Sequence, residues 1–264
     1  MASPLTLHPV GSDIIVDATP LTADGFAAFG DVVQNPRPDL HPSATSPAET
    51  LPFDAVVANQ GSAIKYQHVT RMVNLYDQAP SGRPGIAVAN MFICAARQLL
   101  QLPGDRVQGR AFPVTVLERH PYTAQTFIPL TADPTKRYLV VVAPSLPPSP
   151  ADQGLPVPDP TTAIPGRSRP LAGRGLPDLS RLRAFVANGK QAVTYGAGTW
   201  HAPMVALGEP KTAVDFVVIQ FANNVPVEDC QEVYLGSRTL KPSTEQKTEA
   251  VVVKLPSASA LAKL

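Results

Sequence analysis

Two stretches of the sequence place ionisable side chains where they can act together. The first, "VLERHPYTAQTFIPL" from 116 to 130, has strand character and carries Glu118, His120 and Gln125. Because side chains alternate along a strand, Glu118 and His120 point to one face, about 7 Å apart along it. A carboxylate and an imidazole on one wall can share a ligand, a metal or a proton. Gln125 can join them after the bend at Pro121-Tyr122.

The second stretch is "GAGTWHAP", which ends in His201 and Pro203. A Gly-x-Gly turn lets the backbone bend sharply and present the histidine inward. Glu118, His120 and His201 are therefore the candidates for acid/base catalysis or metal ligation. Glu118 beside Arg119 could instead form a surface ion pair, and His201 could be a core histidine beside Trp200. Their occurrence together favours the functional interpretation.

The elements that must position these residues are mainly strands. Thirty prolines exceed the usual share of about 5% and leave room for many short strands rather than long helices. "KRYLVVVAPS" is typical of a strand buried on both faces, and "TAVDFVVIQF" and "GIAVANMFICAARQLL" also predict strands. A short capped helix is expected after Leu21. The order of elements predicts a mainly β fold, a barrel or sandwich, with a few short helices.

Net charge, cysteine content and hydropathy exclude several classes of protein. The net charge of +1 gives no reason to expect nucleic acid or a membrane surface as partner. The two cysteines, Cys94 and Cys230, have no metal-site spacing and are expected to be reduced. The start of the chain lacks the features of a signal peptide, and no apolar run is long enough for a membrane helix, so we expect a soluble intracellular protein.

Composition divides the chain into three parts. Residues 1–236 are expected to form a single domain. Residues 145–177 are rich in Pro, Gly, Ser and Arg and predict a loop inserted into that domain. Residues 237–264 are polar and repetitive and predict a mobile C-terminal tail.

The two histidine-bearing stretches resemble the two-motif layout of cupins, whose barrel is a double-stranded β-barrel. In the first cupin motif, Glu118 stands where a histidine is usual and Gln125 where a glutamate is usual. A neutral glutamine is a weak metal ligand, so this set predicts at most a weakly held catalytic divalent metal rather than a tight structural one. The expected ligands are His120, His201, Glu118 and Gln125, and the expected ion is Ni, Mn or Zn.

Longer stretches resemble the ureidoglycolate lyase family, also called ureidoglycolate hydrolase, of allantoin degradation. They are "FPVTVLERHPYTAQTFIPL", "LRAFVANGKQAVTYGAGTWHAP" and "VDFVVIQF", extended upstream by "ANQGSAIKY" and "FICAARQL". The resemblance implies a cupin-like barrel, a homodimer, and cleavage of (S)-ureidoglycolate to glyoxylate and urea.

That substrate is a hemiaminal, whose cleavage needs a base at the hydroxyl group and an acid at the departing nitrogen. It also needs cations for the carboxylate, for which Lys65, Arg71 and Arg97 are candidates. Asn59, Tyr66 and Gln125 are candidates for hydrogen bonds to the urea amide. Lys65 and Arg71 could equally be solvated, and Arg97 could be a snorkelling side chain.

Two other functions fit the same barrel. One is a cupin-type protein that binds or senses a small carboxylic acid without turning it over. The other is a metal-dependent oxygenase or isomerase, which the altered ligand set disfavours. The base-bearing cluster disfavours the passive binder, because a binder needs cations more than it needs a base.

The last three residues, Ala262, Lys263 and Leu264, differ in one position from the Ser-Lys-Leu peroxisomal address. They predict recognition by a peroxisomal import receptor. If the tripeptide is a working address, the protein is peroxisomal. If the tripeptide occurs by chance, the protein is cytoplasmic, and the sequence favours neither location over the other.

Overall fold

The structure is a computed structural model that describes residues 5–7, 14–42, 51–101, 110–131, 133–164, 170–236 and 251–261. Within these residues the chain is mainly β, with a few short helices, as predicted. No helix in these residues is long and apolar enough to cross a membrane. The predicted import tripeptide, residues 262–264, lies outside the described residues.

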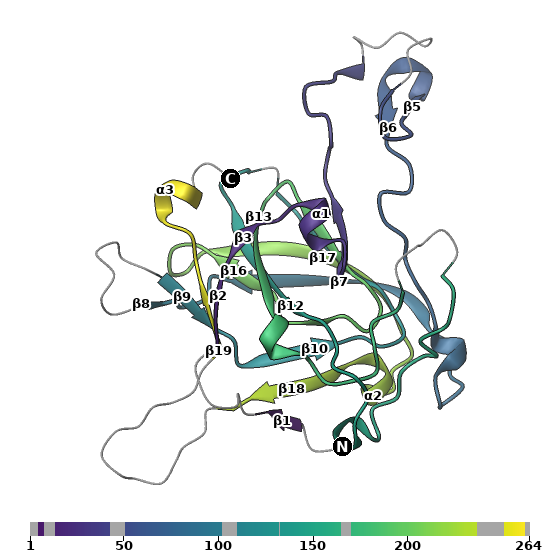
Figure 1. The fold of residues 1–264 in the computed structure, drawn as a ribbon. Coiled ribbons are helices and arrows are strands. Elements are labelled where there is room, and N and C mark those ends of the chain that lie inside the picture. The colour runs from purple at the N-terminus through teal and green to yellow at the C-terminus, as the bar shows by residue number, and fades with distance from the viewer. Residues whose placement is uncertain are drawn as a thin grey trace.

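The strands form two large sheets and two small ones (Figure 1). The eight-stranded sheet runs β1 (Leu5–Leu7), β18 (Gln231–Leu235), β10 (Val116–Arg119), β15 (Trp200–His201), β12 (Arg137–Ala143), β13 (Arg183–Asn188) and β3 (Thr19–Pro20), with β16 (Val205–Leu207) also paired to β12. The five-stranded sheet runs β4 (Gly30–Val33), β14 (Ala192–Tyr195), β11 (Gln125–Pro129), β17 (Ala213–Ala222) and β7 (Ile86–Ala95).

The small sheets and the helices complete the fold. A four-stranded sheet runs β2 (Ile14–Asp17), β19 (Val251–Lys254), β9 (Arg110–Pro113) and β8 (Leu100–Gln101), and β5 (Val56–Ala58) pairs with β6 (Ala63–Lys65). The helical turns are α1 (Ala23–Phe26), η2 (Asn59–Gly61), η3 (Tyr76–Gln78), η4 (Pro150–Asp152), η5 (Leu179–Arg181), α2 (Pro226–Asp229) and α3 (Ala258–Leu261). Thr22 caps the predicted helix after Leu21 by accepting from the Gly25 amide.

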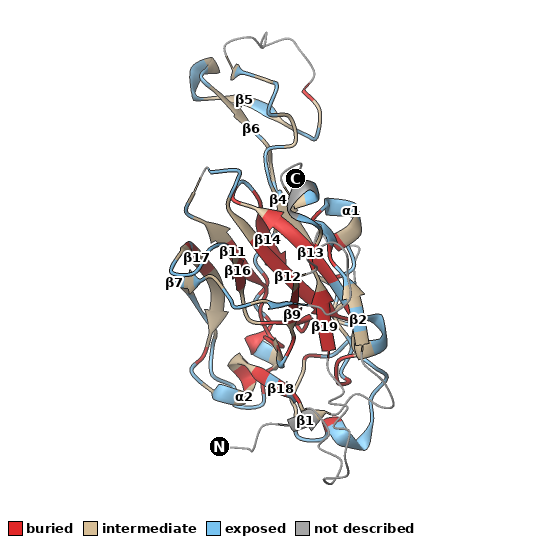
Figure 2. Ribbon diagram, turned by 90° about the vertical axis from the view of Figure 1, so that its left-hand side faces the viewer, coloured by how far each residue is buried: buried red, intermediate tan, exposed pale blue. Residues whose placement is uncertain are grey.

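The core has two apolar layers, one on each side of β12. Tyr138, Val140 and Val142 pack with Phe127 and Phe216 of the five-stranded sheet. The alternate residues Leu139, Val141 and Ala143 pack on the other side, with Phe112, Val251 and Val253 of the four-stranded sheet. The strand is therefore buried on both faces, as its continuous apolar run predicted (Figure 2).

The two large sheets face each other across the first layer, and an isolated bridge between Ala96 and Ala206 joins them at one place. Closure into a cupin-like double-stranded β-barrel stays a prediction, because no continuous ladder joins the two sheets within the described residues.

The prediction of a mobile tail is wrong for part of its range. Strand β19 runs parallel to β2 and antiparallel to β9, and Val253 is fully buried. This strand was missed in the sequence analysis because polar residues precede its three valines. It joins β2 to β9 in the four-stranded sheet.

The two ends of the proline-rich insert are paired with each other. Ser145 forms a bridge with Pro177, and the amide of Leu146 donates to Leu176. Its buried Asp152 closes a capping box with Ser149 and accepts from the guanidinium of Arg174. Much of the insert is therefore fixed by specific polar contacts that composition alone does not reveal.

Candidate active site

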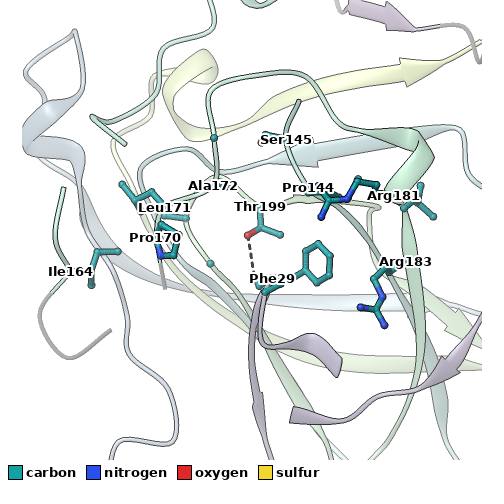
Figure 3. Close-up of a pocket in the computed structure, with 16 residues that line it drawn as sticks. Phe29, Pro144, Ser145, Ile164, Pro170, Leu171, Ala172, Arg181, Arg183 and Thr199 are labelled. Carbon is teal, nitrogen blue, oxygen red and sulfur yellow. Dashed lines mark hydrogen bonds between the residues drawn. The ribbon is translucent and has the colours of Figure 1, made fainter. Parts of the chain in front are cut away.

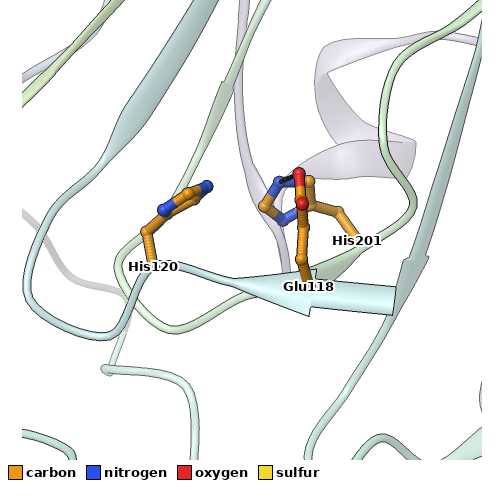
Figure 4. A group of neighbouring side chains, drawn as sticks. All are labelled: Glu118, His120 and His201. Atoms are coloured by element: carbon orange, nitrogen blue, oxygen red, sulfur yellow. Dashed lines mark ion pairs between the residues drawn. The ribbon is translucent and has the colours of Figure 1, made fainter. Parts of the chain in front are cut away.

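Glu118 and His201 meet on neighbouring strands. They are direct cross-strand partners of β10 and β15, and Oε1 of Glu118 lies 3.5 Å from Nε2 of His201. His120 follows β10 immediately, and its ring centroid lies 5.6 Å from that of His201. One ligand atom from each of the three residues lies within 4.8 Å of the others. Figure 4 shows the His120 ring beside the Glu118 carboxylate and the His201 ring, which overlap in this view.

Backbone carbonyls fix the tautomer of both histidines. Nδ1 of His120 lies 2.6 Å from the carbonyl oxygen of Asp229, and Nδ1 of His201 lies 2.9 Å from that of Thr199. A carbonyl only accepts, so Nδ1 carries the proton in each ring. Nε2 of a neutral ring then presents a lone pair. Nε2 of His120 is buried without a hydrogen-bond partner, and Nε2 of His201 faces Oε1 of Glu118 at 3.5 Å. A lone pair in this position can act as a base or as a metal ligand.

The turn before His201 is built as the Gly-x-Gly pattern predicted. Gly198 has φ +75°, a conformation that favours glycine, and its amide donates to the carbonyl of His120. Thr199 donates its hydroxyl to the carbonyl of Phe29. The turn therefore ties the two histidine-bearing segments together through the backbone.

Arg119 fixes the segment that carries Glu118 and His120, from the opposite face of that segment. Its side chain is fully buried, its guanidinium lies 4.4 Å from the centre of the Trp200 ring, and Nε donates to Gln231. Its Nη1 donates to the carbonyls of Gly173, Arg174 and Gly175 in the insert. Burial lowers the pKa of Arg119 to about 10, so it remains a cation at neutral pH. A surface ion pair between Glu118 and Arg119 is therefore excluded.

The surroundings set the charges of the two groups that face the cavity. Burial, followed by the repulsion of a charge on His201, lowers the pKa of His120 to about 4. Burial works to raise the pKa of Glu118, but the hydrogen bond from His201 and the charges of the two histidines outweigh it and bring that pKa below its ordinary value. At neutral pH the site thus combines a neutral imidazole with an ionised carboxylate.

Glu118 and His120 line a cavity of about 290 Å³. Its other described lining residues are Asn90, Phe92, Cys94, Gln125, Phe127, Pro203, Met204 and Gln220. His201 stands behind Glu118, with its ring stacked 4.0 Å from that of Tyr195. Both cysteines are free, and Sγ of Cys230 lies 4.0 Å from Oε2 of Glu118.

Two glutamines form an amide pair in this cavity. Nε2 of Gln125 donates to Oε1 of Gln220 at 2.7 Å, and Oε1 of Gln125 is buried without a partner. Whichever way the two amides are oriented, the pair keeps one acceptor and one donor for a ligand. Gln220 was missed in the sequence analysis, although it is an amide on the face of β17 whose other members Val214, Phe216 and Val218 are buried and apolar.

The other predicted substrate-binding residues lie outside this cavity in their own chain. Lys65, Arg71 and Asn59 are exposed, and Arg97 is exposed with its guanidinium 5.3 Å from the centre of the Phe112 ring. Tyr66 is half-buried, with a hydroxyl that has no hydrogen-bond partner. Asn59, Lys65 and Tyr66 belong to the hairpin of β5 and β6 or directly follow it.

A larger cavity, of about 610 Å³, lies beside the same turn but away from the histidines (Figure 3). Phe29, Leu171 and Ala172 supply apolar walls, and Arg181 and Arg183 stand at one side. No carboxylate, imidazole or thiol is among its described lining residues, so it lacks the groups for acid/base chemistry.

Comparison with known proteins identifies the family of the chain. The family model described as ureidoglycolate lyase matches residues 13–241. A ureidoglycolate lyase of Schizosaccharomyces pombe is 34% identical over 215 residues, covering 81% of this chain and 88% of the relative. Ureidoglycolate lyases of Saccharomyces cerevisiae and Burkholderia mallei are each 32% identical, covering 83% and 76% of this chain and 93% and 78% of the relatives. The chain belongs to the ureidoglycolate lyase family.

Proposed function

We propose that this protein cleaves (S)-ureidoglycolate into glyoxylate and urea. The observation that carries the proposal is the pair formed by Glu118 and His120 in one cavity, in a chain of the ureidoglycolate lyase family. The reaction breaks the bond between the central carbon and the ureido nitrogen. The hydroxyl group becomes the aldehyde, and its proton is in effect transferred to the departing nitrogen.

His120 is the proposed base. It is neutral at the pH of the cell, and its Nε2 lone pair is held in place because Nδ1 is bound to the Asp229 carbonyl. It takes the proton of the substrate hydroxyl, and the electron pair of that O–H bond forms the new carbonyl. Asp229 is itself fixed at the end of α2, where its carboxylate accepts from the hydroxyl of Tyr76.

The proton for the departing nitrogen comes from the pair of Glu118 and His201. A proton shared between Oε1 of Glu118 and Nε2 of His201 reaches the substrate through Glu118, because Glu118 lines the cavity and His201 stands behind it. The proton taken up by His120 then returns to Glu118, and the site is restored. His201 is thus a positioning residue that keeps Glu118 supplied with a proton.

The amide pair is suited to the urea end of the substrate. The free acceptor of Gln125 and Gln220 matches a ureido N–H group, and the free donor matches its carbonyl oxygen. Because Gln125 is buried and Gln220 is partly buried, a substrate that lacks these groups leaves the pair's free acceptor and donor unpaired, at a cost of up to about 1–3 kcal/mol each. The pair therefore selects for an amide-like leaving group.

The same donor set fits a divalent metal. Two orphaned Nε2 atoms and a carboxylate converge, and carbonyls hold both imidazoles from behind, as the outer partners of metal-binding histidines do. Glu118, His120 and His201 would hold the ion, with the free Gln125 oxygen as a further neutral ligand. Two imidazoles with one carboxylate suit Ni, Zn or Mn. Such an ion supplies Lewis-acid stabilisation of a developing oxyanion.

Turnover of (S)-ureidoglycolate by purified protein, before and after chelator treatment, tests the function. We expect urea and glyoxylate in equal amounts and no ammonia. Loss of turnover on chelation, with recovery on adding Ni, Zn or Mn, would assign the three residues to a metal. Retention would leave them as the base and acid described above. No turnover with any of these metals would favour the small-carboxylate binding protein.

Peroxisomal import through Ala262, Lys263 and Leu264 is a separate proposal, supported by the likeness of this tripeptide to Ser-Lys-Leu. A fluorescent protein fused before residue 1 should enter peroxisomes, and Leu264→Asp should leave it in the cytoplasm. Equal distribution of the two fusions would remove the proposal.

A further inference from the structure

The cavity holds a carboxylate of its own but no cation for the carboxylate of its substrate. None of its described lining residues is lysine or arginine, and Glu118 is ionised. Binding an anion next to a carboxylate is unfavourable unless a cation offsets the repulsion. On the proposed function, the site formed by one chain is therefore incomplete.

A segment of the same chain is exposed and, within the described residues, has no surface of its own chain to pack on. Residues 51–70, here called the arm, contain the hairpin of β5 and β6 and extend away from the body of the molecule (Figures 1 and 2). Leu51 is the arm's only buried residue. Phe53 is 63% exposed, and Val56 and Val69 are exposed as well. A two-stranded hairpin is marginally stable in water by itself, so the arm needs a surface to pack on.

The backbone of the arm is also strained. Phe53, Asp54, Asn59, Gln60 and His68 all have positive φ, between 50° and 59°. This conformation is uncommon for residues other than glycine, and a bulky side chain such as Phe53 is an outlier there. Strain of this kind persists where surrounding contacts hold it in place. Within its own chain the exposed Phe53 side chain has few such contacts.

Strand β7 offers the matching surface. It is the edge of the five-stranded sheet, runs for ten residues and contains no charged residue. Ile86, Met91 and Ile93 are between 60% and 74% exposed, and Phe92 is 43% exposed. Edge strands are usually protected by charges or proline, and an uncovered apolar edge indicates a contact with another chain. Phe92 and Asn90 of this strand also line the catalytic cavity, so whatever covers β7 borders the active site.

We propose that a second copy of the chain completes the site: the arm of each subunit covers strand β7 of the other, and its Lys65 binds the substrate carboxylate there. Lys65 ends β6, is exposed, and is the arm's only lysine or arginine. An exchange of arms about a two-fold axis covers both apolar surfaces in each subunit and needs no third protein. It brings a cation to each cavity, which a monomer lacks.

Shared sites are tested by complementation between two inactive variants. Lys65→Ala and His120→Asn chains with different tags are coexpressed, and the mixed dimer is purified through both tags. One of its two sites then carries both substitutions and the other carries none, so we expect about half of the wild-type kcat per dimer. If Lys65 serves its own chain, each site carries one substitution and activity stays at the level of the two parent variants, which overturns the proposal.

A matched control replaces Lys65→Ala by Lys190→Ala, an exposed lysine in the turn before β14. A mixed dimer of Lys190→Ala with His120→Asn has one unaltered site in any arrangement. It should also reach half of the wild-type kcat, which shows that coexpression yields correctly assembled dimers.

Dimerisation is measured independently of the lyase assay, by sedimentation of the wild type and of the variants Phe53→Asp and Ile93→Asp. We expect a dimer whose Kd rises at least tenfold, that is by about 1.4 kcal/mol or more, with either substitution. A monomeric wild type, or a dimer that neither substitution weakens, overturns the proposal even if the protein has no lyase activity. A wild type that dimerises as described but produces no glyoxylate instead rejects the proposed function.

Discussion

The neutral state of His120 makes a quantitative prediction about acid stability. Burial brings the pKa of His120 to about 4 in the folded protein, from an ordinary value of 6.5. Between these values the unfolded chain binds a proton at this residue and the folded chain does not. The stabilisation is therefore complete above pH 6.5 and decreases as the pH falls toward 4.

The size of the effect follows from the two pKa values. One pKa unit corresponds to about 1.4 kcal/mol. Between pH 7 and pH 5, the free energy of unfolding should fall by about 2 kcal/mol through His120 alone. Glu118 does not contribute over this interval, because its pKa lies below its ordinary value and it stays ionised in the folded protein.

The assay is urea unfolding of the chelator-treated protein at pH 7 and pH 5. His120→Asn is the test variant, because an asparagine amide can still donate to the Asp229 carbonyl but does not titrate. The fall in the free energy of unfolding between the two pH values should be about 2 kcal/mol smaller in this variant. His68→Asn is the control: His68 is exposed, and asparagine tolerates its positive φ. An equal fall in His120→Asn and wild type would refute a neutral His120 in the folded protein.

Three further predictions concern the amide pair, the buried arginine next to the site, and the core. Gln125→Leu removes one member of the amide pair and should raise KM for ureidoglycolate by about tenfold or more, measured by glyoxylate release; an unchanged KM would contradict a role in urea recognition. Arg119→Lys keeps the charge but cannot span the three insert carbonyls, so the free energy of unfolding should fall by about 2–4 kcal/mol; an unchanged urea midpoint would show that the insert is held by other contacts. Val253→Ala should cost about 2 kcal/mol in the same assay, because Val253 is fully buried, and no loss would contradict a core position for β19.

Local sequence patterns predicted the elements that carry the site. The alternation through Glu118 and His120 and the Gly-x-Gly turn before His201 both specify backbone geometry within a few residues. In the structure Glu118 lies on β10, His120 directly follows that strand, and His201 lies on the neighbouring β15. The continuous apolar run at β12 likewise predicted its burial on both faces. These features depend on the conformation of a few neighbouring residues, and the types of those residues specify it.

Features that depend on distant pairing could not be predicted in this way. Gln220 was missed because its role depends on the register of β17 against β11. The core position of β19 depends on β2 and β9, and the order in the insert depends on a guanidinium at residue 119. Lys65 was predicted from its charge, but its distance from the cavity in its own chain became visible only in the structure.

The parallel ladder between β2 and β19 affects how the protein folds during synthesis. It pairs Ile14 with Val251, which are 237 residues apart in the sequence (251 − 14). Such a contact encloses nearly the whole chain in one loop, and native contacts of high sequence separation slow folding. Strand β19 also lies between β2 and β9, so these two strands are joined into one sheet only when residues 251–254 pair with both. Folding of this sheet therefore waits for residues 251–254, and the apolar residues of β2 and β9 lack the strand that joins them until it is in place.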